Sequence, residues 1–138
     1  MAVACKLVRS VALVLAVFAA GATARAETPN YKPSIGEAVL TPKFCWHQFM
    51  GNKFSGPQFE ITHEACGVYV NHYCPGLIDL NRANKAIGDD GRRRAYLLSA
   101  RENTLYTLRG IKPYPNCPIR AHVEATLRII DAKLKAFR

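Results

Sequence analysis

Residues 65–87 read ACGVYVNHYCPGLIDLNRANKAI, and this stretch decides the fold class. Its apolar and aromatic residues recur every three or four positions, which places them on one face of an α-helix. That face holds Ala65, Val68, Tyr69, His72, Tyr73, Leu77, Leu80, Ala83 and Ile87. Pro75 has no backbone N–H to donate, so we expect a kink there, although the apolar face keeps its phase across it. The stretch therefore predicts one long, kinked helix.

The flanking sequence predicts three more helices. Thr41 and Pro42 are typical of a helix start, with the Thr41 hydroxyl as N-cap, and they predict a short helix over residues 42–50. After a turn at residues 88–91, spaced leucines predict a helix over residues 92–109. A connector with two prolines, residues 110–117, leads to a last helix over residues 118–138. No segment predicts a strand, so we expect an all-α fold of four helices in two helical hairpins.

The N-terminal residues are typical of a secretory signal peptide. Lys6 and Arg9 precede an apolar run over residues 10–22, and residues 24–26 form an A-x-A cleavage site. The run of 13 residues is shorter than the roughly 20 that a transmembrane helix needs. We therefore expect residues 1–26 to be removed and the protein to be periplasmic or secreted. No transmembrane segment is then expected to remain.

The expected mature chain has 112 residues (138 less 26) and a net charge of +6, with 16 basic and 10 acidic residues. Residues 27–40 contain two prolines and predict an extended lead-in, and residues 41–138 predict a single helical domain. A hydrophobic content of 49% excludes a disordered tail.

Four cysteines remain in this mature chain: Cys45, Cys66, Cys74 and Cys117. An exported chain of this size with four cysteines predicts two disulfides. The spacings of 20, 7 and 42 intervening residues match no zinc-site pattern. Of the three possible pairings, an antiparallel packing of the two central helices favours Cys66–Cys117, which leaves Cys45 for Cys74.

Several short motifs resemble a family of exported bacterial tetratricopeptide-repeat-like proteins. They are KFC at 43–45, VNHYCPGL at 70–77, LNRA at 80–83, RRR at 92–94, YLL at 96–98, YTLR at 106–109 and PIRAH at 118–122. The resemblance covers about residues 40–138 and includes the positions of Cys45 and Cys74. It implies two helical hairpins held by disulfides, and a protein- or peptide-binding or scaffolding role without catalytic residues. Unlike a 34-residue repeat, this chain has a long connector between its last two helices.

The histidines suggest an alternative function, a periplasmic copper- or haem-binding protein. Its ligands would be His47 and Met50 on one short helix, with His63 and His72, because imidazole and thioether suit these metals. His72 lies on the apolar face, however, where a core histidine is the simpler expectation. The sequence HEACG at 63–67 lacks the second histidine of a zinc-protease motif. The main prediction therefore includes no cofactor.

Positive charge is concentrated at Arg92, Arg93 and Arg94 at the start of the third predicted helix. Together with Trp46, these residues are our candidate binding residues for a protein or peptide partner in the cell envelope. Nucleic acid is not an expected partner of an exported protein, and basic and aromatic residues are not interleaved. No motif for acyl transfer or nucleotide chemistry occurs, so we expect no enzymatic activity.

Overall fold

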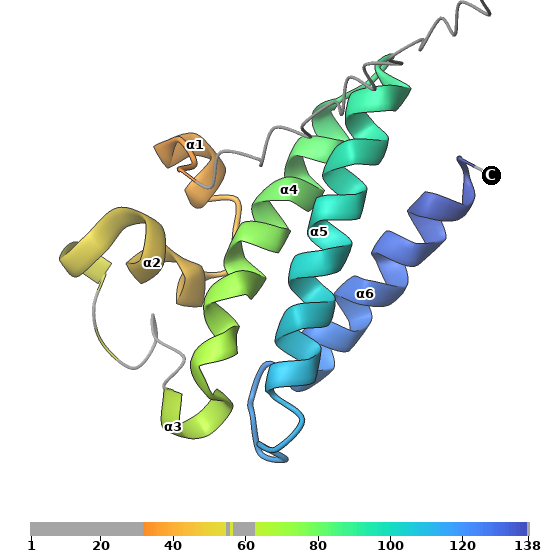
Figure 1. The fold of residues 1–138 in the computed structure, drawn as a ribbon. Helices are drawn as coiled ribbons and strands as arrows, with labels where there is room; N and C mark the ends of the chain where they lie inside the picture. Colours follow the sequence, from red (N-terminus) through yellow and green to blue (C-terminus); the bar gives the residue numbers. More distant parts are fainter. Residues whose placement is uncertain (1–31, 55, 57–62, 138) are drawn as a thin grey trace, which may run out of the picture.

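The computed structural model describes residues 32–54, 56 and 63–137, and over these residues the chain is all-α with no β-strand. Three long helices lie side by side (Figure 1). They are α4 (Tyr73–Lys85), α5 (Asp90–Gly110) and α6 (Arg120–Lys135). α5 lies between the other two, and consecutive helices run antiparallel. The predicted all-α fold class is thus confirmed, whereas the arrangement as two tetratricopeptide-like hairpins stays a prediction. The proposed signal peptide lies outside the described residues.

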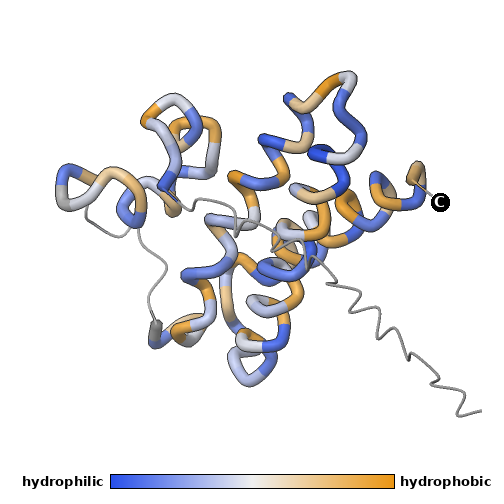
Figure 2. The backbone as a smooth tube through the Cα atoms, turned by 45° about the horizontal axis from the view of Figure 1, so that its top comes forward, coloured by the Kyte–Doolittle hydropathy of each residue, from blue (hydrophilic) through white to orange (hydrophobic). Residues whose placement is uncertain are grey.

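The remaining elements are short and gather on the side of α4 away from α6 or at its lower end (Figure 1). They are α1 (Ile35–Ala38), η1 (Lys43–Cys45), α2 (Trp46–Met50), η2 (Gly51–Phe54), α3 (His63–Cys66) and η3 (Val68–His72), where η marks a 3₁₀ helix. The hydropathy of the backbone (Figure 2) shows hydrophobic and hydrophilic positions alternating along the helix that leads to the C-terminus. This is the pattern of a helix with one face on a core.

The prediction of one long kinked helix is wrong. The break falls at Gly67, which has a φ of 73° and which ends α3 before η3 begins. A Cβ at this position would lie 2.6 Å from the ring of Tyr114. Pro75 causes no kink because it lies in the first turn of α4, where a backbone N–H has no partner within the helix. Because α3, η3 and α4 are separate segments, they do not place their apolar residues on one common face. Four residues of the predicted apolar face are therefore exposed: Val68, Tyr69, His72 and Ile87.

Two predictions near the N-terminus are also wrong. Thr41 does not cap a helix; its hydroxyl donates to the Ala38 carbonyl at 2.6 Å, and η1 starts after Pro42 without a side-chain cap. The described part of the expected lead-in, residues 32–40, is not extended throughout because it contains α1. Ser34 and Glu37 form a reciprocal capping box that satisfies the free N–H groups of this short helix.

The predicted disulfide pairing is confirmed. Cys45 is bonded to Cys74, and Cys66 is bonded to Cys117. All four cysteines are buried in one core cluster with Val70, Tyr73, Leu77, Ile111, Ile119 and Val123. The first bridge ties the short N-terminal elements to α4, and the second ties α3 to the segment that leads into α6.

α4 and α5 pack closely through small and polar residues. A Cβ on Gly76 would lie 3.0 Å from the Asn103 Cβ and 3.3 Å from the Ala100 carbonyl. Thr104 and Thr107 are fully buried on the same face of α5, and their hydroxyls donate to carbonyls one turn earlier. Their polar groups are thereby satisfied inside the helix, which lets two backbones approach without an unpaired buried group.

The first half of α6 is anchored to the rest of the protein by polar contacts that are buried or half-buried. The Tyr73 hydroxyl of α4 bonds to the His122 Nδ1 and, at 2.7 Å, to the Thr126 hydroxyl. Burial raises the pKa of Tyr73 to about 12, so the phenol stays protonated. Arg120 donates to the carbonyls of Ile111 and Tyr114 in the preceding segment. These contacts fix the start of α6, whereas its end separates from α5 (Figure 1).

α1 is held on α4 by an ion pair whose strength depends on pH. The Arg82 Nε donates to Glu37 Oε1 at 2.6 Å, and this hydrogen bond lowers the Glu37 pKa from its ordinary value of 4.5 to about 2. A lowered carboxyl pKa contributes stability that is fully present above pH 4.5 and is lost as the pH falls toward 2.

We predict that Glu37→Gln lowers the free energy of unfolding at pH 7 by about 1 kcal/mol, since the pair is partly exposed. The deficit should shrink as the pH falls from 4.5 toward 2 and should disappear below about pH 2, where Glu37 itself is mostly neutral. Urea titrations at several pH values measure both effects. Glu102→Gln is the control because Glu102 is 71% exposed and its ion pair with Arg101 is long, at 3.8 Å. A deficit that does not change with pH would contradict the assignment.

Candidate functional site

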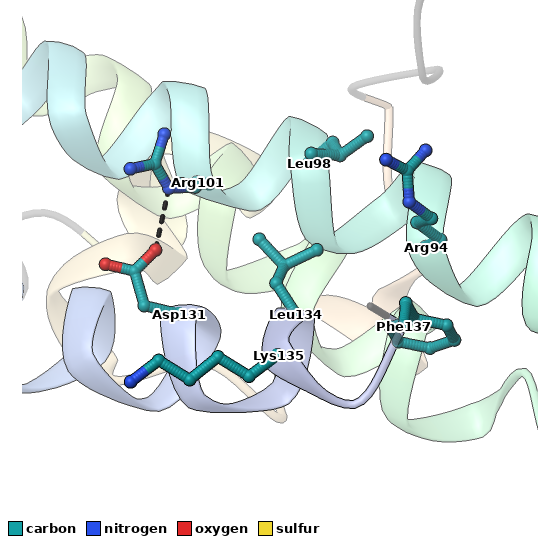
Figure 3. A pocket seen from close by; sticks show the side chains of 7 residues that line it. All are labelled: Arg94, Leu98, Arg101, Asp131, Leu134, Lys135 and Phe137. Atoms are coloured by element: carbon teal, nitrogen blue, oxygen red, sulfur yellow. Dashed lines mark hydrogen bonds and ion pairs between the residues drawn. The ribbon is translucent and has the colours of Figure 1, made fainter.

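An open cleft of about 510 Å³ lies between the first half of α5 and the end of α6. Its lining residues are Arg94, Leu98 and Arg101 from α5, with Asp131, Leu134, Lys135 and Phe137 from α6 and the residues that follow it. Figure 3 shows Leu98 and Leu134 in the space between the two helices, with Arg94 beside Phe137 at one end. The volume is within the range of about 300–1,000 Å³ that is common for ligand sites.

The cleft has an apolar floor and a positive rim. Among the described residues, Asp131 is the only carboxylate in the lining. It accepts a hydrogen bond from Arg101 Nε at 2.7 Å and is neutralised by it. This pair raises the Arg101 pKa above its ordinary value. Within the described residues, Arg94 and Lys135 form no ion pair. Two uncompensated cations therefore flank the leucines.

The structure separates the four predicted binding residues. Arg94 lines the cleft, and the Arg93 guanidinium lies 5.6 Å from the centre of the Phe137 ring, at cation–π distance. Arg92 instead pairs with Asp89, the N-cap residue of α5, at 3.3 Å. Trp46 lies on α2, where its indole N–H donates to the Thr41 carbonyl and its ring packs edge-on against Phe54. It belongs to the N-terminal elements and not to the cleft.

The predicted alternative metal ligands lie on three short elements, α2, α3 and η3. His47 and Met50 are on α2, whereas His72 ends η3, bonds to Asn103 at 3.2 Å and packs at a tilt against the Tyr106 ring. The side chain of His63 lies outside the described residues. Among side chains that the structure does describe, no three of His, Cys, Asp and Glu gather as metal ligands would.

A second hollow, of about 380 Å³, lies at the opposite end of α5. Tyr69, Tyr106, Arg109, Gly110 and Pro113 line it, and the two tyrosine rings are 5.2 Å apart. We did not predict this site, because the helical pattern placed Tyr69 in the core. The sequence did contain a signal for it, because Gly110 and Pro113 mark the end of a helix. At such an end, a nearby aromatic ring can pack against backbone that no side chain covers.

The apolar floor of the main cleft was also missed. Leu98 is one of the spaced leucines of the helix predicted over residues 92–109, yet it is 40% exposed. Periodicity identifies the apolar face of a helix, but it does not show whether another element covers that face. The adjacent arginine run was the available signal, since apolar residues next to unpaired cations are typical of interaction surfaces.

No family model, curated protein or solved structure matches this chain. None of the helices in the described residues has the length and apolar content needed to cross a lipid bilayer.

Proposed function

We propose that this protein is an exported, non-catalytic binding module that captures a protein or peptide segment in the cleft between α5 and α6. The observation that carries the proposal is the apolar floor of the cleft, where Leu98 is exposed and Leu134 and Phe137 are half-buried. Arg94 and Lys135, which form no ion pair within the described residues, flank this floor. Apolar surface that stays open between two packed helices is typical of a site that another chain completes.

Two further features support this proposal. The two buried disulfides fit a protein that works in an oxidising compartment, in agreement with the signal peptide expected at residues 1–26. The resemblance to exported tetratricopeptide-repeat-like proteins favours the same role, because such helical hairpins bind peptides on their open faces.

A substitution inside the cleft should weaken peptide binding. Peptides selected from a random display library against the disulfide-bonded protein should bind the Leu98→Asp variant at least about tenfold more weakly, because the change places a charge on the apolar floor. Binding is measured by fluorescence anisotropy with labelled peptides.

Ile129→Asp is the matched control for this experiment. Ile129 is 51% exposed on α6 but does not line the cleft. We expect it to leave the affinity within about twofold of the parent protein, as most surface changes do. Peptides that bind Leu98→Asp as tightly as the parent protein would contradict the proposed site.

A further inference from the structure

We propose that the segment bound in the α5–α6 cleft is an acidic amphipathic helix of a partner protein. This inference rests on the proposed function and specifies the chemistry of the ligand. The lining contains three cations and one carboxylate, and that carboxylate is paired with Arg101. Within the described part of the chain, the cleft therefore offers two unpaired positive charges beside leucine and phenylalanine side chains. Its complement is a ligand with carboxylates beside apolar groups.

The geometry of the cleft favours a helix as the bound element. Its α5 wall runs from Arg94 to Arg101, which is two helical turns or about 10 Å at 1.5 Å per residue. The other wall is the end of α6, so the open space lies between two helices, as in grooves that hold an amphipathic helix. Apolar residues at positions i, i+3 and i+4 of that helix would contact Leu98, Leu134 and Phe137.

The positions of the charges define where the ligand carboxylates lie. Arg94 stands beside Phe137 at one end of the floor, while Lys135 runs along α6 away from Phe137 (Figure 3). A helix lying on the leucines would therefore find one cation near each end. Arg93 adds positive potential at the Phe137 end, since its guanidinium lies over that ring.

A second copy of this chain is the main competing occupant. Ile87 is 90% exposed in the turn before α5, and Asp89 and Asp90 follow it as the N-cap and first residue of α5. This segment therefore has carboxylates beside an exposed apolar residue, as the proposed ligand does. Asp89 is already paired with Arg92, however, and caps α5, which makes it a weaker match for the cleft.

The probes are three synthetic helices of about 16 residues, long enough to form a helix in solution. Each has leucine on one face, and the other face carries glutamate, glutamine or lysine. We expect the glutamate peptide to bind the disulfide-bonded protein about tenfold more tightly than the glutamine peptide, with the lysine peptide weakest. The preference should decrease as salt is raised to about 1 M, where charges are screened within roughly 3 Å.

A charge-reversal variant tests the assigned residues. The double variant Arg94→Glu, Lys135→Glu should bind the glutamate peptide at least about tenfold more weakly and should now prefer the lysine peptide. The double variant Lys43→Glu, Lys112→Glu makes the same change in net charge at exposed residues outside the cleft. It should keep the original preference. Circular dichroism spectra confirm that both variants are folded.

Each other outcome has a distinct meaning. If the three peptides bind equally and Leu98→Asp weakens all of them, the acidic ligand is wrong but the cleft remains a binding site. If none of the three synthetic peptides binds, and the library-selected peptides bind Leu98→Asp as tightly as the parent protein, the proposed function fails as well. Sedimentation could also show that the parent protein is a dimer. If this dimer is lost in Ile87→Ser and in the Arg94→Glu, Lys135→Glu variant, the occupant of the cleft is a second copy of the chain and the proposal is overturned.

Discussion

Replacing Cys66 and Cys117 together by alanine is expected to lower the free energy of unfolding by about 4 kcal/mol, the loop-closure entropy for a cross-link of this span. The bridge joins residues 51 positions apart, and both cysteines are buried. Typical domains have only about 5–15 kcal/mol of total stability. Urea unfolding followed by circular dichroism measures the loss, and we expect partial unfolding of the variant near body temperature.

The second disulfide provides the control for this experiment. Cys45 and Cys74 are 29 positions apart, so removing their bridge should cost about 3.5 kcal/mol, nearly as much. It ties the N-terminal elements to α4 and does not contact the cleft, so the folded fraction should still bind peptide. Loss of Cys66–Cys117 should weaken binding, because that bridge fixes the segment leading into α6. Equal stability of the parent protein and the Cys66, Cys117 variant would contradict this account.

Gly76→Leu is expected to destabilise the protein by about 2–3 kcal/mol, the cost of overpacking a close helix contact. Helix propensity alone predicts the opposite sign, since leucine is favoured over glycine by about 0.8 kcal/mol. The packing effect should be larger because even a Cβ would lie 3.0 Å from the Asn103 Cβ and 3.3 Å from a backbone carbonyl. The leucine would force α4 and α5 apart. Thermal and urea unfolding measure the net effect.

Gly91→Leu is the matched control. Gly91 lies in the first turn of α5, and a Cβ there would meet only an Asp89 carboxylate oxygen, at 3.7 Å. The same substitution should therefore leave stability unchanged or raise it by less than about 1 kcal/mol. If Gly76→Leu and Gly91→Leu behave alike, the close α4–α5 contact does not exist in solution.

Much of the architecture could be predicted from the sequence, because strong local signals agreed with the fold. The leucine spacing placed a helix over residues 92–109, close to the observed Asp90–Gly110. The antiparallel arrangement of neighbouring helices then favoured the correct disulfide pairing. These features depend on periodicity and chain connectivity, which a single sequence contains.

Other features depend on tertiary contacts that periodicity does not report. The core face of α5 contains Asn103, Thr104 and Thr107, which hydropathy assigns to the surface. They are buried because their side chains bond to carbonyls one turn earlier and because Gly76 lets α4 approach. This close packing turns Leu98 away from α4 and leaves it exposed in the cleft. The candidate site was therefore only partly predictable, through the charge of Arg94.

The most direct measurement is an NMR titration of ¹⁵N-labelled, disulfide-bonded protein with a library-selected peptide. Our account predicts that the amide shifts gather along the cleft, at Arg94, Leu98, Arg101 and the last turns of α6 through Phe137. Shifts that gather instead around Tyr69 and Tyr106 at the other end of α5, or around Trp46 on α2, would contradict it.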